Sequence, residues 1–238
     1  MSDATEMPSP LECVFLDAGN TLLGPWPSFE GRLVEVASRH GVSFEEASVE
    51  AAIMAADREA IWPTDWTDPA TQRGFWFGFY VDVLDRLGHG GDHRELADAL
   101  SNAFVDPAAY KLYDDAGPAL AALAERGLKL GIISNFEPWL RDVLRLEGVL
   151  DRFSALAISG VLGVAKPQPE IFEYALDQAG VPASAAIHVG DHPEVDAAAA
   201  RAVGIHPVLI DRFKRVPPEA GPRIGSLTEL VELIDAEA

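Results

Sequence analysis

The chain has 238 residues, 48% of them hydrophobic, so it can bury a core and is not a disordered polypeptide. Eighteen Lys and Arg residues against 38 Asp and Glu residues give a net charge of −20, which repels nucleic acid and anionic lipid surfaces. Composition therefore argues against both as partners. A phosphate ligand would need a local positive charge from a metal ion or a lysine.

The single cysteine, Cys13, excludes an internal disulfide and favours a reducing, cytoplasmic location. Residues 1–10 lack a basic flank followed by an apolar run, and we expect them to form a flexible tail rather than a signal peptide. No stretch approaches about 18 uninterrupted apolar residues, so a membrane span is not expected. The sequence is compatible with a monomer or a homodimer.

In chain order, the first predicted element is a buried strand at 11–16, which ends at Asp17. From residue 28 to residue 110 the apolar residues recur at helical spacing, which predicts an all-helical insertion. Breaks that would divide it into about four helices are expected at Gly41, at 62–69 and at 88–91.

Beyond residue 110, strands and helices alternate. Further strands are predicted at 128–133, 153–158, 185–189 and 207–210. Helices are predicted at 116–126, 137–147, 170–179, 194–203 and 227–236. This alternation predicts an α/β fold with a doubly wound parallel sheet that binds ligands beyond the carboxyl ends of its strands. We expect an α/β core at 11–24 and 111–238, with a helical cap at 25–110.

Polar residues follow the first four predicted strands. Because the carboxyl ends of parallel strands share one edge of a sheet, we expect these residues to converge in one crevice. In strand order they are Asp17, then Ser134 with Asn135, then Lys166, then Asp191 with Asp196.

These residue types suit phosphoryl transfer through a transient aspartyl-phosphate, with Asp17 as the nucleophile. Asp191 could share a magnesium ion with Asp17 and the main-chain carbonyl of Gly19, because Mg²⁺ prefers oxygen ligands. Ser134 would donate a hydrogen bond to a phosphoryl oxygen, and Lys166 would supply positive charge.

Two further residues complete the predicted site. Asp196 is expected to orient metal-bound water or Lys166 rather than to bind the metal directly. Asn135 is expected to bind substrate together with Ser134 and Lys166. Each residue alone has a plainer interpretation, since Asp17 and Ser134 could cap helices and a lysine before a proline is usually solvated. Their order and spacing favour the functional interpretation.

Four stretches of the chain resemble motifs of the haloacid dehalogenase-like (HAD) hydrolase superfamily: VFLDAGNTL (14–22), IISNF (132–136), GVAKPQPEIF (163–172) and VGDHPEVD (189–196). The resemblance implies a Rossmann-like core with a helical cap between the first two motifs. It also implies an Asp17 nucleophile, phosphate binding by Ser134 and Lys166, and Mg²⁺ bound through Asp17 and Asp191. A small phosphorylated metabolite is the expected substrate.

The chain departs from the family pattern at Gly19, where most phosphatases of the superfamily carry an aspartate that serves as general acid and base. A positioned acid or base typically contributes about 10²- to 10⁴-fold to the rate, so we expect slow turnover of substrates with poor leaving groups. Substitute acids suggested by the sequence are Glu137 and His192, and either could equally be a surface residue.

Three functions remain open at this point. The first is a phosphatase that takes its acid from elsewhere or acts on substrates that leave easily. The second is a metal-independent 2-haloacid dehalogenase, which the retained Gly190-Asp191 pair argues against, because dehalogenases usually carry serine-rich sequence there. The third is a non-catalytic phosphate-binding or interaction protein that keeps the fold.

Overall fold

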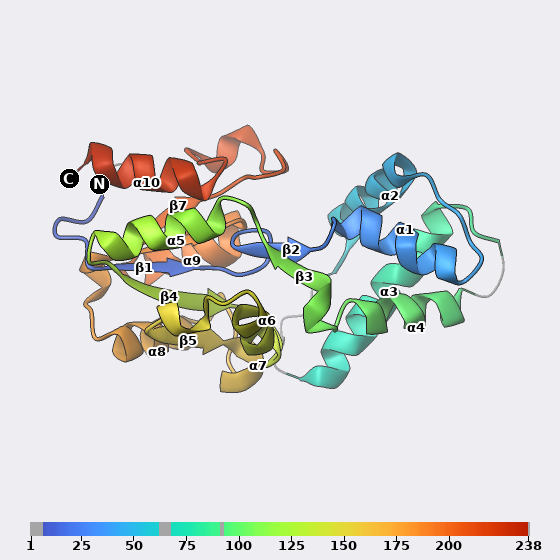
Figure 1. The fold of residues 1–238 in the computed structure, drawn as a ribbon, viewed down its shortest axis with the longest axis horizontal. Helices are drawn as coiled ribbons and strands as arrows, with labels where there is room; N and C mark the ends of the chain where they lie inside the picture. The colour runs from blue at the N-terminus through green and yellow to red at the C-terminus, as the bar shows by residue number, and fades with distance from the viewer. Residues whose placement is uncertain (1–6, 62–67, 91–92, 238) are drawn as a thin grey trace. The chain divides into compact units, whose positions relative to one another are not determined.

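The computed structural model describes residues 7–61, 68–90 and 93–237, and the chain divides into two compact units (Figure 1). The core comprises Met1–Leu23 and Leu112–Ala238, and the insertion comprises Gly24–Lys111. None of the helices in the described ranges is long and apolar enough to cross a membrane.

The core is built on a five-stranded parallel sheet in the order β5-β4-β1-β6-β7. The central strand, β1 (Cys13–Leu16), pairs with β4 (Lys129–Ser134) on one side and with β6 (Ala186–Gly190) on the other. The edge strands are β5 (Ala155–Ile158) and β7 (His206–Leu209). The α/β fold with a parallel sheet is thus confirmed.

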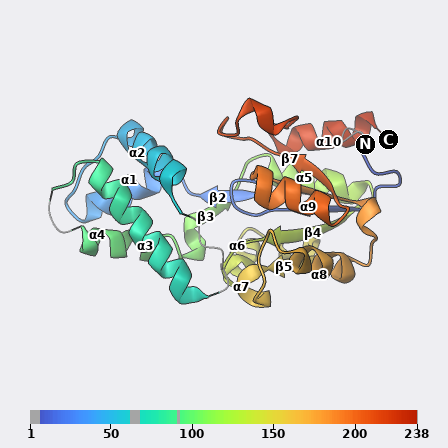
Figure 2. The ribbon, with the colours of Figure 1, turned by 180° about the vertical axis from the view of Figure 1, so that it is seen from behind.

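Helices cover both faces of this sheet, because successive side chains of a buried parallel strand point to opposite faces. On one face, Phe15 packs in a buried cluster with side chains of α8 (Pro169–Ala179) and α9 (Ala199–Ala202). On the other, α5 (Ala116–Glu125) contacts β4 and lies beside α10 (Leu227–Ala236) (Figures 1 and 2). The sheet is therefore doubly wound, and its carboxyl edge is left for ligands.

Two predicted helices differ from the structure at their starts. The helix predicted at 137–147 begins later, as α6 (Leu140–Leu146), because the main chain from Glu137 onward first forms tight turns, in which N–H groups bond carbonyls three residues earlier. The helix predicted at 194–203 begins with a π-helical segment, η4 (Pro193–Ala198), that runs into α9. Both differences are local changes in main-chain hydrogen-bond spacing, which apolar periodicity does not report.

The insertion contains four α-helices in its described residues: α1 (Phe29–Arg39), α2 (Glu46–Glu59), α3 (Pro69–Arg86) and α4 (Arg94–Ala103). They enclose a core of their own, in which Phe29, Tyr80 and Phe104 stack on one another. Most of the break predicted at 62–69 lies outside the described residues. The insertion thus has its own packed interior.

The chain enters and leaves the insertion through two short strands that were not predicted, β2 (Leu23–Pro25) and β3 (Tyr110–Leu112), which form a two-stranded sheet. Another unpredicted element is the single-turn helix α7 (Ser159–Leu162). Short 3₁₀ helices lie at Pro107–Ala109, Leu150–Arg152, Ala183–Ala185 and Pro218–Ala220.

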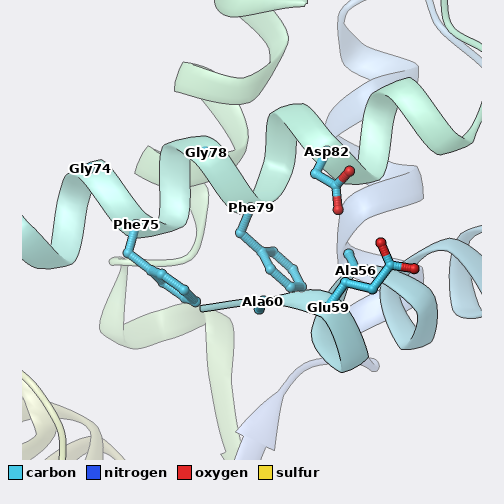
Figure 3. Close-up of a pocket in the computed structure, with 8 residues that line it drawn as sticks. All are labelled: Ala56, Glu59, Ala60, Gly74, Phe75, Gly78, Phe79 and Asp82. Atoms are coloured by element: carbon cyan, nitrogen blue, oxygen red, sulfur yellow. The ribbon is translucent and has the colours of Figure 1, made fainter. Parts of the chain in front are cut away.

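A pocket of about 280 Å³ opens between α2 and α3 within the insertion (Figure 3). Phe75 and Phe79 form its aromatic wall, and the bare backbone at Gly74 and Gly78 leaves space beside them. Arg86 pairs with both carboxylates that line the pocket, Glu59 and Asp82, so its single positive charge balances one of their two negative charges. The remaining lining residues are Ala56 and Ala60.

Candidate active site

Asp17 is the first residue beyond β1, at the carboxyl edge of the sheet. Its main-chain N–H donates to the carbonyl of Val189 on β6 at 2.8 Å, which extends the strand pairing to the nucleophile candidate. No helix follows it directly, because the chain turns into β2, so the helix-cap interpretation of Asp17 is wrong. The side chain is buried, and burial raises the pKa of its carboxyl group, against the opposing charge of Lys166.

Lys166 reaches this carboxylate from the loop that precedes α8. Its Nζ donates to Oδ1 of Asp17 at 2.7 Å and to Oδ1 of Asp196 at 2.5 Å. The residue is 5% exposed, so its interpretation as a solvated lysine is wrong. Burial alone would lower the pKa of Lys166, but the two carboxylates outweigh it and hold the pKa above its usual value. The ammonium charge is therefore fixed next to Asp17.

Asn135 holds the loop that carries Lys166. Its Nδ2 donates to the main-chain carbonyl of Lys166 at 2.9 Å, and its Oδ1 accepts from the main-chain N–H of Lys166 at 2.7 Å. The sequence placed Asn135 among the substrate-binding residues, whereas both ends of its amide are engaged by the protein. These contacts position the loop, and substrate binding by Asn135 stays a prediction.

Asp196 lies behind Lys166 and is 2% exposed. It is held there by the π-helical turn η4 and by the main-chain N–H of His192, which donates to Oδ2 at 3.0 Å. A methyl group at Gly190 would lie 2.2 Å from Cγ of Asp196, so this approach requires glycine at the end of β6. Burial opposes ionisation of Asp196, yet Lys166 and then His188 outweigh it and lower the pKa of the carboxyl group.

Asp191 follows β6 and completes a group of three carboxylates. Oxygens of Asp17, Asp191 and Asp196 lie within 4.8 Å of one another. Burial first, and then the charges of Asp17 and Asp196, raise the pKa of Asp191 to about 8. Asn20 partly offsets this by donating from Nδ2 to Oδ2 of Asp191 at 3.1 Å. Negative charge at this edge of the sheet therefore exceeds what Lys166 alone neutralises.

The donor set fits a hard divalent cation such as Mg²⁺, which binds carboxylate and carbonyl oxygens. Asp196 is already engaged, since Lys166 and His188 donate to its Oδ1 and the His192 N–H donates to its Oδ2. Asp17 and Asp191 are the carboxylates of the group that could take the ion. The excess negative charge between them is what such a cation would neutralise.

Ser134 ends β4, the strand next to β1, and is fully buried. Its Oγ has no hydrogen-bond partner among the described residues. Helix α6 begins at Leu140 without a side-chain cap, so the helix-cap interpretation of Ser134 is wrong. A buried hydroxyl without a partner is costly in free energy and marks a position where a ligand oxygen could bind.

Gly19 and the two suggested substitute acids occupy different settings. Gly19 has open space, with no atom within 4 Å of the position a Cβ would take. His192 is exposed, and its Nδ1 accepts from the main-chain N–H groups of Glu194 and Val195, which makes it a helix cap. Burial raises the pKa of the Glu137 carboxyl group above its usual value.

Comparison with known proteins places this site in a family. A sequence model of the haloacid dehalogenase-like hydrolases matches residues 11–204. The chain belongs to the haloacid dehalogenase-like hydrolases. Its match spans β1 to α9 and so includes every residue of the site described above.

Three HAD relatives illustrate the range. The chain is 33% identical to "Haloacid dehalogenase-like hydrolase domain-containing protein 3" of Danio rerio, over 88% of this chain and 91% of that protein. It is 32% identical to a phosphoserine phosphatase of Thermus thermophilus, over 92% and 98%. The putative HAD hydrolase YfnB of Bacillus subtilis, solved with magnesium, shares the fold with a TM-score of 0.71 at 18% identity, over 94% and 99%.

Sequence reasoning missed two residues of this HAD site. Asn20 adopts a left-handed backbone conformation with φ of 53°, which brings its amide to Asp191, and asparagine is one of the few residues that tolerate that conformation. His188 looked like one residue of a buried strand, yet its Nε2 lies 2.9 Å from Asp196. A histidine inside an otherwise apolar strand is the signal that could have found it.

Proposed function

We propose that the chain is a magnesium-dependent phosphatase that hydrolyses a small phosphorylated metabolite through an aspartyl-phosphate at Asp17. The observation that carries the proposal is that the carboxylates of Asp17 and Asp191 lie in one cluster, beside the buried lysine Lys166. In phosphoryl transfer, one carboxylate can act as the nucleophile, and the carboxylates together can bind a divalent cation. The cation and the lysine then balance the negative charge of the carboxylates and of the phosphoryl group.

The residues around Asp17 have complementary tasks in this reaction. The Asp17 carboxylate attacks phosphorus, so that a bond forms between its oxygen and phosphorus while the bond to the leaving oxygen breaks. Lys166 lies next to that carboxylate and offers positive charge to the phosphoryl oxygens. The unpartnered hydroxyl of Ser134 supplies a hydrogen bond to one of them. Water then attacks phosphorus and the bond between phosphorus and the Asp17 oxygen breaks. The released phosphate keeps the protons of the water, and the Asp17 carboxylate is regenerated.

Asp17, Asp191 and the main-chain carbonyl of Gly19 would hold Mg²⁺, which would supply charge neutralisation for the phosphoryl oxygens. Asp196 positions Lys166 by binding its ammonium group, and Asn135 does so by binding the Lys166 main chain. These contacts keep a long, flexible side chain in one place before substrate arrives, so less ordering is needed during the reaction.

The leaving oxygen needs a proton unless it is a stable anion. No carboxylate stands at Gly19 to supply one, so we propose fast turnover of activated esters and slow turnover of alkyl phosphates. Glu137 is the favoured substitute acid of the two suggested, because burial raises its pKa while His192 is engaged as a helix cap. We further propose that side chains of the helical insertion select the substrate.

The alternatives receive less support. A metal-independent dehalogenase has no use for Asp191 beside its nucleophile, where the second carboxylate repels the first. A non-catalytic binding protein has no need of a buried lysine ion-paired with Asp17, because desolvating such a pair is costly unless the geometry serves a purpose.

Hydrolysis of p-nitrophenyl phosphate tests the proposal, because its aryloxide leaves without a proton. We expect turnover with Mg²⁺, loss of turnover with EDTA, and loss in Asp17→Asn, which keeps the shape of the side chain but removes the nucleophilic charge. Wild-type activity no higher than that of Asp17→Asn across a broad panel of phosphate esters would support the binding protein. Metal-independent halide release from a 2-haloacid would support the dehalogenase.

A further inference from the structure

His188 is a buried polar residue that the proposed reaction does not use. It lies in the middle of β6, where it pairs with Phe15 of β1 and with Pro207 of β7, and it is fully buried. Its ring meets the ring of Phe172 edge to face, with centroids 5.4 Å apart. A histidine in an apolar layer loses its contacts with water, so its remaining polar contact matters for what it does.

That contact is with Asp196. Nε2 of His188 lies 2.9 Å from Oδ1 of Asp196, the same oxygen that accepts from Nζ of Lys166 at 2.5 Å. Nζ in turn donates to Asp17 at 2.7 Å. A continuous chain of buried hydrogen bonds therefore runs from the interior of the sheet to the nucleophile: His188, Asp196, Lys166 and Asp17.

The direction of the first hydrogen bond follows from the acceptor. An ionised carboxylate only accepts, so Nε2 of His188 carries the proton and donates it. Nδ1 is buried and has no partner among the described residues, which suits an unprotonated nitrogen better than an N–H group. His188 is thus present as the Nε2–H tautomer with a single strong contact.

Oδ1 of Asp196 therefore takes two donors, and the lysine competes with the histidine for it. Without the histidine, this oxygen would face Lys166 alone, and the ammonium group would be drawn toward Asp196 and away from Asp17. The other carboxylate oxygen of Asp196, Oδ2, already accepts a hydrogen bond from the main-chain N–H of His192. The hydrogen bond from His188 to Asp196 therefore affects how close the Lys166 ammonium group lies to Asp17.

We propose that His188 is a positioning residue that holds the Asp196 carboxylate and thereby keeps the Lys166 ammonium group on Asp17. The proposal rests on the proposed phosphatase reaction for its kinetic consequence, but the placement of Lys166 is a separate and observable property. Among the described residues, the side-chain hydrogen bond of His188 is to Asp196, so His188 acts through its neighbours.

Three substitutions separate this role from simple packing. His188→Gln keeps a nitrogen donor at nearly the place of Nε2, whereas His188→Leu removes every donor. His188→Asn keeps a polar amide that is too short to reach Asp196, so it covers the case in which the leucine variant does not fold. Phe172→Leu is the matched control, because it disturbs the packing of the same ring and leaves the donor to Asp196 in place.

The first measurement is steady-state kinetics on p-nitrophenyl phosphate with Mg²⁺. We expect kcat to fall about ten- to hundredfold in His188→Leu and His188→Asn, as for loss of a hydrogen bond to a charged group, with KM changing far less. His188→Gln should recover most of kcat, and Phe172→Leu should stay within a fewfold of wild type. Equal losses in all four variants, or a kcat for His188→Leu near that of wild type, would overturn the proposal.

The second measurement does not depend on activity. In ¹⁵N NMR spectra of the metal-free protein, we expect an unprotonated Nδ1 and a protonated Nε2 at His188. We also expect an exchange-protected Lys166 ammonium resonance that persists in His188→Gln and is lost in His188→Leu. A protonated Nδ1, or an unchanged Lys166 resonance in all variants, would refute the positioning role. If wild type proves inactive while these spectra are as expected, the phosphatase proposal fails and the positioning of Lys166 stands.

Discussion

Gly19 is the residue at which this chain departs most from the expected site. The open space around it means that a larger side chain can be tested there without a clash. We predict that Gly19→Asp raises turnover of alkyl phosphates by about 10²-fold or more, because a positioned general acid protonates the leaving oxygen. Turnover of p-nitrophenyl phosphate should change much less, since its leaving group needs no proton.

Gly19→Asn is the control for that experiment, because it has nearly the same shape and no acidic proton. It should leave alkyl phosphate turnover low. If Gly19→Asp turns over alkyl phosphates no faster than Gly19→Asn, the missing aspartate is not what limits this reaction.

Asp191 provides a pH-dependent test of metal binding. In the metal-free protein its pKa is raised to about 8, whereas an exposed aspartate titrates near about 4. The folded state therefore holds a proton that the unfolded state releases, and the stability contributed by Asp191 is lost as pH rises from about 4 toward about 8. Magnesium binds only the ionised carboxylate, so its stabilising effect grows over the same interval.

We predict that Mg²⁺ raises the melting temperature more at about pH 8.5 than at about pH 6, as measured by thermal unfolding with and without the ion. In Asp191→Asn the effect of the ion should shrink at both pH values. An equal shift at the two pH values, or an undiminished shift in Asp191→Asn, would contradict metal binding at this carboxylate.

At the residue scale, the sequence predicted which residues lie near one another better than it predicted the hydrogen bonds between them. Asp17 and Asp191 directly follow predicted strands, Lys166 lies in the loop region after another strand, and the three lie close together in the structure. The hydrogen bonds between the Asn135 side chain and the Lys166 main chain depend on the path of the loop before α8, which the spacing of strand ends does not predict.

Among the elements, the five core strands could be predicted because each is a short apolar run that ends in polar residues or a turn. The predicted start of β1 is only two residues early, at residue 11 instead of Cys13. The strands β2 and β3 were missed because each has only three residues, and β2 ends in a proline, Pro25. Their pairing with each other defines them, and no apolar pattern marks them in the sequence. The π-helical turn at η4 was likewise invisible to apolar periodicity.

Helix α3 offers a test of element stability. Gly78 lies in its interior with no atom within 4 Å of an added Cβ. We predict that Gly78→Ala stabilises the insertion by about 0.5–1 kcal/mol, because alanine loses less backbone entropy in a helix than glycine does. Amide hydrogen exchange within α3 measures the change.

Gly190→Ala is the contrasting variant. The added methyl group would meet Asp196, so we expect lower stability and loss of the site geometry. If both alanine variants changed stability in the same direction and to the same extent, local space would not be what distinguishes the two glycines.

At the scale of the whole molecule, alternation of strands and helices was enough to predict a parallel α/β core. The chain passes between the two units through β2 and β3, which lie side by side. Substrate identity was beyond sequence reasoning, because it depends on side chains whose arrangement no local pattern specifies.

The candidate site of the α/β core centres on the Asp17 carboxylate, with Lys166 against it and Asp191 close by. The most direct test is to quench the enzyme with acid during turnover of p-nitrophenyl phosphate and to map phosphorylation by mass spectrometry. We predict a phosphoryl group on Asp17 that hydroxylamine removes and that is absent in Asp17→Asn. Steady turnover with an unmodified Asp17, or turnover retained in Asp17→Asn, would contradict it.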